Sequence, residues 1–310
     1  MATVAEQLTS LANTKTAIKN AIVAKGVAVA DTDPFSAYAG KIGEIQAGGG
    51  GEPVAKTKYG ISIDNLIGKY SETNGLYPPE DEFVADFSGV KKLFNSALYY
   101  KFASTMSNFS SGVTKILMPD VEVVSGSCCE GMARNAYNLT EFYAPKLTTA
   151  TSNSFAYAFY GTSNLKTVDI SGLTELSGSQ ACYYMFYSSG ITELNLDNLT
   201  TISGNSACYY MFAQSDIVQM NFKSLTTISG PSACRYMFNM CKSFVRVDFP
   251  ALTSVVNGAL GSTLASTGIF ANCSALVEIH FRADAQAMIE ALQGYSVKWG
   301  ATNATIYFDL

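Results

Sequence analysis

Residues 191–216 read ITELNLDNLTTISGNSACYYMFAQSD, and close copies of this string stand directly before and after it. The copy at 165–190 contains QACYYMF where residues 206–212 are SACYYMF, and the copy at 217–243 contains SACRYMF. The first apolar residues of five successive units lie 26 residues apart; they are Val113, Leu139, Leu165, Ile191 and Ile217. A fixed period of this length is the signature of a solenoid, in which each unit forms one turn of a stack.

Less regular units extend the repeat in both directions. A degenerate unit starts at about Phe83, and the unit at 244–275 carries about five inserted residues. Within a unit, apolar residues recur at relative positions 1, 4, 6, 9 and 12. Positions 4 and 6, Leu194 and Leu196 in the central unit, have the period of two that places both side chains on one face of a strand. Each unit therefore predicts a short strand with an apolar inner face.

The recurring string ACYYMF predicts a short helical or 3₁₀ segment. Cys208, Met211 and Phe212 have the i, i+3, i+4 spacing that gathers side chains on one inward stripe. The cysteines have no histidine or second cysteine at the spacing of a metal site, so we interpret them as buried thiols of the core. The tyrosines fit either packing between neighbouring units or a row of carbohydrate contacts, and the sequence leaves both open.

The motif LxxLxLxxLTxI, followed by MF or AF before a small polar turn, resembles the leucine-rich repeats of the BspA-like class, found in surface proteins of gut and oral bacteria. The resemblance covers residues 83–282. It implies an α/β solenoid of units of about 26 residues. Such units bury their apolar faces only against their neighbours, so the open ends need caps.

Residues 283–310 are predicted to cap the C-terminal end. The string RADAQAMIEALQG predicts a helix with Asp284 as its N-cap and Gly294 just past its end. The final string, TIYFDL, has the alternation of a strand. The residues expected to face the core are Ala285, Met288, Ile289 and Leu292 of the helix, and Ile306, Phe308 and Leu310 of the strand.

Residues 1–46 predict a small helical module of a different composition. Thr3 and Glu6 form a capping box, Gly26 ends the first helix, and Asp33 with Pro34 begins the second. Two short helices cannot bury enough surface to be stable alone, so we expect them to self-associate or to dock on a partner. The residues expected to make these assembly contacts are Val4, Leu8, Leu11, Ile18, Ile22, Phe35, Tyr38 and Ile42.

Residues 47–82, with AGGGG and three prolines, predict a Gly-rich linker and connector. The preceding segment, TKTAIKNAIVAKGVAVADTDPFSAYAGKIGEI, resembles the N-terminal modules of tail-fibre-like proteins of gut bacteriophages. In that family the module precedes a Gly-rich linker and a variable distal domain. The resemblance implies that the N-terminal helices attach the chain to other virion proteins, in a homo-oligomer.

The composition argues against several classes of protein. A net charge of −5 gives no electrostatic reason to expect nucleic acid. No apolar run is long enough to span a membrane, and the N-terminus lacks the pattern of a signal peptide, so we expect neither membrane insertion nor general secretion. With one histidine and seven cysteines, we expect no metal site, no cofactor and no disulfide framework.

No catalytic motif is present, and we predict that the protein is not an enzyme. The best carboxylate pair is Asp169 with Asp197, which stacking would place on one face at a spacing that some inverting glycosidases use. Nothing nearby in the sequence would bury either group, so we interpret both as solvated acids. A glycan-active enzyme is the remaining catalytic alternative.

The outward column between the core residues of the strands is the natural ligand surface. It is polar and mixed, a chemistry that suits sugar hydroxyls or a polar protein surface. A solvated sheet face without a ligand is the alternative. The residues predicted to contact a ligand are Tyr143, Asp169, Asn195, Asn221, Asp248 and His280.

These features predict a non-enzymatic recognition protein of the virion tail, similar to phage tail fibres. It would bind a glycan or protein receptor on the host cell surface through its solenoid. The alternative is a BspA-like adhesin or protein-interaction module on the bacterial cell surface.

Overall fold

The structure is a computed structural model that describes residues 83–103 and 113–310. It also describes scattered residues between 12 and 38, namely 12, 14–16, 18–20, 22, 23, 29, 30, 32, 34 and 38. The chain divides into two compact units, Met1–Ala55 and Lys56–Leu310. The linker and connector predicted over 47–82 lie outside the described residues.

In the N-terminal unit, the described residues from Ala12 to Val23 are helical. Ile22, Val29 and Tyr38 form a buried cluster, and Ile18 packs against it. Three of the residues predicted to make assembly contacts therefore contact each other or their neighbours within this unit. The other five lie outside the described residues; they are Val4, Leu8, Leu11, Phe35 and Ile42.

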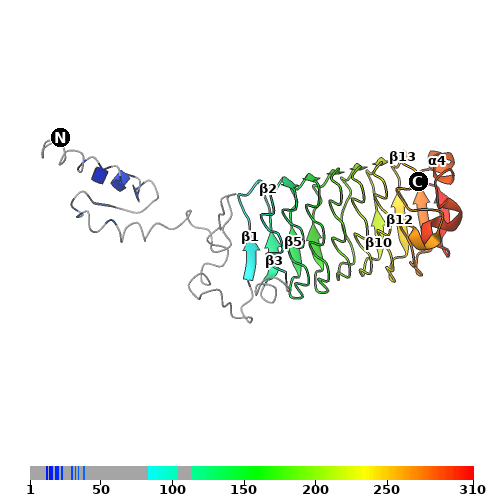
Figure 1. The fold of residues 1–310 in the computed structure, drawn as a ribbon, viewed down its shortest axis with the longest axis horizontal. Coiled ribbons are helices and arrows are strands. Elements are labelled where there is room, and N and C mark those ends of the chain that lie inside the picture. Colours follow the sequence, from blue (N-terminus) through cyan, green and yellow to red (C-terminus); the bar gives the residue numbers. More distant parts are fainter. Residues whose placement is uncertain are drawn as a thin grey trace. The chain divides into compact units, whose positions relative to one another are not determined.

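Residues 83–103 and 113–310 form a parallel β-solenoid in which most turns contribute strands to two sides (Figure 1). The first side consists of two four-stranded sheets, which we call the strand face. Its strands are β1 (Phe83–Asp86), β3 (Val113–Leu117), β5 (Glu141–Tyr143) and β7 (Thr167–Asp169), followed by β10 (Gln219–Asn221), β12 (Arg246–Phe249), β14 (Glu278–Phe281) and β15 (Thr305–Phe308).

The second side is one continuous seven-stranded sheet. Its strands are β2 (Lys92–Phe94), β4 (Val123–Ser125), β6 (Thr149–Ala150), β8 (Glu175–Leu176), β9 (Thr201–Ile202), β11 (Thr227–Ile228) and β13 (Ser254–Val255). Beside these strands, a threonine in each of five successive turns donates its hydroxyl to a carbonyl oxygen of the preceding turn, as Thr200 does to Thr174 at 3.0 Å. The threonine of the LTxI motif thus helps to hold successive turns in register.

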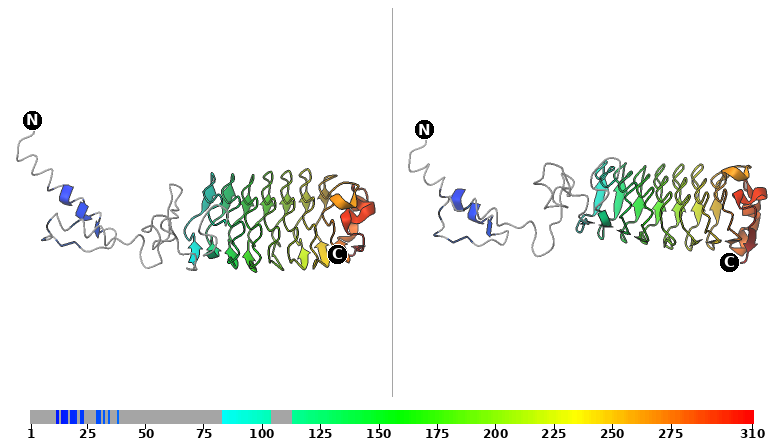
Figure 2. Two further views of the ribbon diagram at one scale, coloured as in Figure 1. Left: turned by 60° about the horizontal axis from the view of Figure 1, so that its bottom comes forward. Right: turned by 90° about the horizontal axis from the view of Figure 1, so that it is seen from below.

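The third side corrects the prediction of an α/β solenoid. The ACYYMF segments are not helical; they are linked turns in which every fourth residue has a positive φ, such as Gln180, Tyr184 and Ser188. The N–H of Tyr183 donates within the turn to Gln180, whereas the N–H of Tyr184 donates to Tyr209 of the next turn. The backbone therefore bonds both within and between turns, and the views of Figure 2 show these turns stacked without a helical layer.

The core of the solenoid is built from columns of like side chains. Phe212 stacks between Phe186, at 5.7 Å between ring centroids, and Phe238, at 5.3 Å. All seven cysteines are free and buried, and burial raises the pKa of the Cys182 thiol to about 12. The interpretation of the cysteines as core thiols is confirmed, as is the inward direction of Met211.

The C-terminal end is closed by short helices (Figures 1 and 2), namely η2 (Ala265–Thr267), η3 (Ala283–Ala285), α4 (Gln286–Glu290) and η4 (Tyr295–Gly300). The predicted core-facing residues Ala285 and Ile289 are buried, and Met288, Leu292, Ile306 and Phe308 are half-buried. Three predictions are wrong. Asp284 is not an N-cap, because it lies inside η3 and pairs with Arg282. Gly294 does not directly follow the helix, because α4 ends at Glu290 and Gly294 precedes η4. Leu310 is exposed beyond the end of β15.

Candidate functional site

The strand face is interrupted in its middle. We name turns by the first residue of their sequence unit, so that β7 belongs to turn 165 and β10 to turn 217. The intervening turn 191 has no strand here, and within the described part of the chain residues 193–196 make no backbone hydrogen bond to either neighbouring turn. Its segment includes Asn195, Asp197 and Asn198, residue types that are depleted in strands.

The interruption is confined to one side of the solenoid. On the second side β8 pairs with β9, and on the third side the N–H of Cys182 donates to Ala207 at 2.8 Å. At one end of the opening, the Lys166 ammonium donates to the carbonyl oxygen of Gly190 at 2.6 Å. At the other end, the Asn198 amide donates to the carbonyl oxygen of Ser171 at 2.8 Å. The opening is therefore bounded by a side-chain hydrogen bond at each end.

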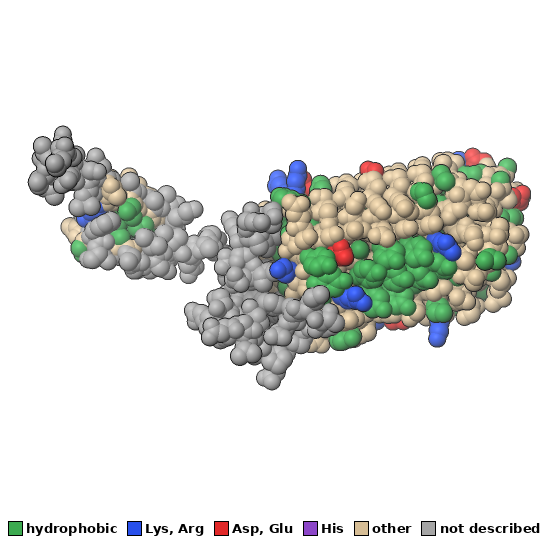
Figure 3. All heavy atoms as spheres, in the orientation of Figure 1, with side chains coloured by type: hydrophobic (Ala, Val, Ile, Leu, Met, Phe, Trp, Pro, Cys, Tyr) green, Lys and Arg blue, Asp and Glu red, His purple; other side chains and the backbone are tan. Residues whose placement is uncertain are grey.

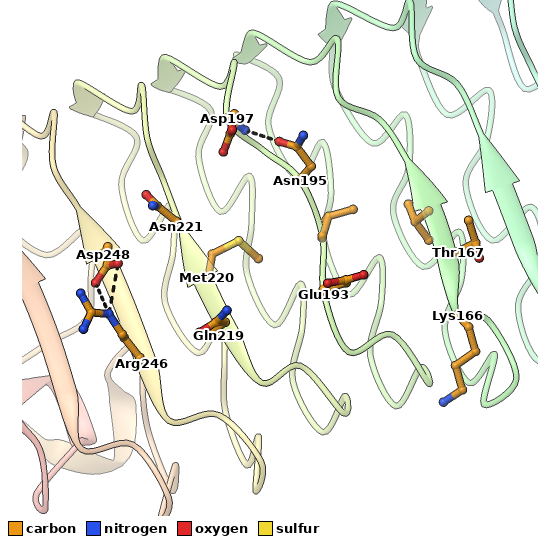
Figure 4. Close-up of a pocket in the computed structure, with 12 residues that line it drawn as sticks. Lys166, Thr167, Glu193, Asn195, Asp197, Gln219, Met220, Asn221, Arg246 and Asp248 are labelled. Carbon is orange, nitrogen blue, oxygen red and sulfur yellow. Dashed lines mark hydrogen bonds and ion pairs between the residues drawn. The ribbon is translucent and has the colours of Figure 1, made fainter.

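A hollow of about 530 Å³ lies at this interruption (Figure 4). Its floor is formed by core residues that the missing ladder uncovers, namely Val168, Leu194 and Met220. Leu194 is 8% exposed and Val168 is half-buried, whereas the equivalent Phe142 of an intact turn is 0% exposed. The hollow thus combines an apolar floor with polar walls.

Two rows of side chains form the walls. Glu193, Gln219 and Arg246 lie in one row, and Asn195, Asn221 and Asp248 lie in the other (Figure 4). Lys166, Thr167 and Asp197 complete the lining. Carboxamides and carboxylates above an apolar floor are the combination found in sites for polar organic ligands.

The hollow contains three of the six residues predicted to contact a ligand, Asn195, Asn221 and Asp248. Members of the predicted column do lie opposite each other on neighbouring strands: Tyr143 pairs with Asp169, and Asp248 pairs with His280. Tyr143, Asp169 and His280 nevertheless lie outside the lining. The apolar floor was not predicted, and the only signal for it in the sequence is the density of Asn and Asp in turn 191.

The charges around the hollow are largely paired. Arg246 donates to Asp248 at 2.9 Å and to Glu278 at 3.0 Å, and the hydrogen bonds with Asp248 are the main cause of a raised pKa of the guanidinium. Asp197 lies 3.9 Å from Lys223. Three carboxylates and two cations line the hollow, so it offers no free positive charge to an anion.

The carboxylate pair considered for glycoside hydrolysis does not share a site. The Asp169 carboxylate accepts hydrogen bonds from the N–H and hydroxyl of Ser171, two residues along the chain. Asp197 lines the hollow and Asp169 does not. Among the residues that the structure describes, no group of three His, Cys, Asp or Glu side chains is placed to hold a metal ion.

His280 lies on β14 of the strand face, next to the C-terminal strand β15. Its Nδ1 is 2.7 Å from Asp309, its Nε2 is 3.4 Å from Glu278, and its ring stacks on Tyr307. The histidine is buried, and these contacts join β14 to β15. His280 therefore helps to attach the C-terminal strand, and it lies away from the hollow.

Hydrophobic side chains form a continuous band along one side of the solenoid (Figure 3). The band is made of tyrosines in the linked turns. Tyr184 stacks on Tyr157 at 5.2 Å and on Tyr210 at 4.7 Å, and Tyr210 stacks on Tyr236 at 4.6 Å. We call this the tyrosine band; its residues are Tyr157, Tyr160, Tyr183, Tyr184, Tyr187, Tyr209, Tyr210 and Tyr236.

The band contributes packing between turns, one of the two alternatives that the sequence left open. Stacking between neighbouring turns covers ring faces in the band, and each of its tyrosines is half-buried, so part of each side chain stays accessible. Burial raises the pKa of Tyr157 and of Tyr210 to about 12. The hydroxyls of these tyrosines therefore remain protonated at neutral pH and can donate hydrogen bonds.

No protein-family model and no curated protein matches the chain. Among solved structures, it is similar to a leucine-rich repeat protein from Bacteroides ovatus, with 12% sequence identity and a TM-score of 0.23. The match covers 64% of this chain and 61% of that one, which is less than two thirds of that protein's length. The hydrogen bonds of the chain itself define its class as a parallel β-solenoid. Within the described ranges, no helix has the length and apolar character needed to cross a membrane.

Proposed function

We propose that this chain is a non-enzymatic recognition protein that binds a host surface glycan in the hollow of its strand face. The observation that carries the proposal is the interruption at turn 191, which exposes an apolar floor beneath polar walls. An apolar sugar face suits the floor of Val168, Leu194 and Met220. Sugar hydroxyls suit the carboxamides of Asn195 and Asn221, and also the peptide groups that lack a partner in the neighbouring turns.

The charges of the hollow favour an uncharged glycan. Arg246 is neutralised by Asp248 and Glu278, and Lys166 is bound to a backbone carbonyl and lies 3.8 Å from Asp216. An anionic sugar would therefore meet carboxylates without a compensating cation. The hollow binds neutral polyhydroxylated ligands in preference to acidic ones.

A peptide strand suits the hollow less well than a glycan does. Insertion of a strand would require a further spacing of about 4.8 Å between turns 165 and 191. The second and third sides hold these turns together, through Thr200 donating to Thr174 and Cys182 donating to Ala207. The ligand therefore rests in the opening from outside.

Asn195→Ala and Asn221→Ala are each expected to weaken binding of a neutral glycan about tenfold, because each removes a hydrogen-bonding wall group. The ligand would first be selected from an array of neutral hexose and N-acetylhexosamine oligosaccharides and then titrated by calorimetry. Asn164→Ala is the matched control, because its exposed amide bonds only the carbonyl of Tyr137 and lies outside the lining. Equal affinities for all three variants and the parent chain would rule out the hollow as the glycan site.

The setting in a virion, and the BspA-like assignment of the repeats, belong to this proposal and rest on the sequence resemblances. A fibre-type protein attached by residues 1–46 is expected to self-associate through them. Light scattering should therefore give a multimer for the full chain and a folded monomer for the chain that lacks residues 1–46. A truncated chain that stays multimeric would contradict the assembly role of the N-terminal helices.

A further inference from the structure

We infer that the tyrosine band is a second ligand surface, separate from the hollow, and that it binds an acidic polysaccharide chain lying along the solenoid axis. The carboxylates of the polysaccharide would contact Arg134 at one end of the band and Arg235 at the other. The sugar hydroxyls between them would contact the tyrosine hydroxyls.

Both arginines place their guanidinium groups over tyrosine rings of the band. The Arg134 guanidinium lies 5.3 Å from the ring centroid of Tyr157 and 4.7 Å from that of Tyr160. The Arg235 guanidinium lies 4.9 Å from the ring centroid of Tyr236. Cation–π contacts of this kind hold a guanidinium in place and leave its charge uncompensated.

Neither guanidinium has a carboxylate partner among the described residues. The chain contains four arginines, and the other two, Arg246 and Arg282, each pair with an aspartate. Arg134 Nε is buried without any hydrogen-bond partner, and its Nη1 reaches only the hydroxyl of Tyr100 at 3.4 Å. The hydrogen bonds of Arg235 go to the neutral oxygens of Thr267 and Tyr236. Each end of the band therefore has a guanidinium without a carboxylate partner, in a protein that is acidic as a whole.

The geometry favours a polysaccharide over other acidic polymers. Four steps between turns separate the arginines, which corresponds to roughly 19 Å along the axis at the usual strand spacing. Two isolated cations are too few for a nucleic acid, whose binding depends on many phosphate contacts. An acidic peptide would gain backbone hydrogen bonds only at a free strand edge, and the backbone N–H groups of this side, such as those of Tyr183 and Tyr184, already bond within the turns or between them.

The test uses the full chain and hexagalacturonate, a carboxylated hexasaccharide long enough to reach both arginines. Its fully methyl-esterified form is the uncharged control, and digalacturonate is too short to reach both ends. We expect hexagalacturonate to bind at low salt, with an affinity that falls as salt is raised. We expect the ester and the short form to bind at least about tenfold more weakly.

Arg134→Gln and Arg235→Gln are each expected to weaken hexagalacturonate binding about tenfold. Lys146→Gln removes the same charge from a lysine that is paired with Asp120 elsewhere on the surface, and should have less than about a twofold effect. Tyr210→Phe offers a second variant that keeps the ring stack and removes one hydroxyl; it should weaken binding by severalfold. Asn221→Ala in the hollow should leave this binding unchanged.

Three results would overturn the inference: no binding of hexagalacturonate, binding that neither arginine variant alters, or tighter binding of hexaglutamate than of hexagalacturonate. The last would identify the band as a surface for acidic proteins. Because the probe and the variants differ from those used for the hollow, either surface can fail its test without deciding the other.

Discussion

Phe212→Ala is expected to lower the free energy of unfolding of the solenoid by about 3–5 kcal/mol. Phe212 is 0% exposed and lies in the middle turn of the phenylalanine column, between Phe186 and Phe238. Removing the ring leaves a cavity that continuous backbone ladders on two sides prevent from collapsing. Urea unfolding followed by far-UV circular dichroism measures the loss.

The same variant tests how far the turns unfold together. Trp299, the single tryptophan, is buried in the C-terminal cap, so its fluorescence reports on that end. In a solenoid each turn contacts only its neighbours, and a weak turn in the middle can uncouple the two ends. We expect the fluorescence and dichroism transitions of Phe212→Ala to separate. Phe212→Leu, which keeps most of the volume, should cost less than about 1.5 kcal/mol. If the alanine variant were as stable as the leucine variant, filling the core at this position of the phenylalanine column would not contribute to stability.

Gly204→Ala is expected to cost about 3 kcal/mol or more, because the added methyl group has no space. A Cβ at Gly204 would lie 2.0 Å from the carbonyl oxygen of Gly178, and a Cβ at Gly230 would lie 2.1 Å from that of Gly204. These glycines stack at the same position of successive turns, so only a separation of the turns would relieve the contact. Thermal and urea unfolding of the variant measure the cost.

Gly89→Ala is the control that distinguishes the steric effect of an added methyl group from the loss of glycine's backbone freedom. Gly89 has a φ of +82° and no atom within 4 Å of an added Cβ. Its substitution should lower the free energy of unfolding by about 1 kcal/mol, the cost of placing alanine in the left-handed conformation. Equal losses for Gly89→Ala and Gly204→Ala would show that the stacked turns adjust to a methyl group, contrary to the geometry.

The fold gives each side of the solenoid a different chemistry. The strand face is open at turn 191 and presents paired charges and carboxamides, whereas the tyrosine band is closed by ring stacking and carries an arginine at each end. The sheet of β2 to β13 holds the turns at a constant spacing between these two surfaces.

The repeat in the sequence determined the solenoid, its inward residues and its outward column. The period of 26 aligns Tyr143 with Asp169, and the structure pairs these two residues. The inward direction of Cys208, Met211 and Phe212 was also predictable, because their identity and spacing repeat in each turn. Local pattern is sufficient for such features since every turn repeats the same environment.

Only the tertiary structure showed the conformation of the ACYYMF segments and the turn whose hydrogen bonding differs from that of the others. The ACYYMF segment has helical spacing, yet hydrogen bonds to the next turn, such as that from Tyr184 to Tyr209, favour linked turns with positive φ. The hollow at residues 193–196 and the unpaired charge of Arg134 depend on the distance between adjacent turns and on what lies across it. A periodic pattern specifies which residues recur, but the hydrogen bonds between turns are made by pairs of turns in space, and their loss at one turn leaves the period unchanged.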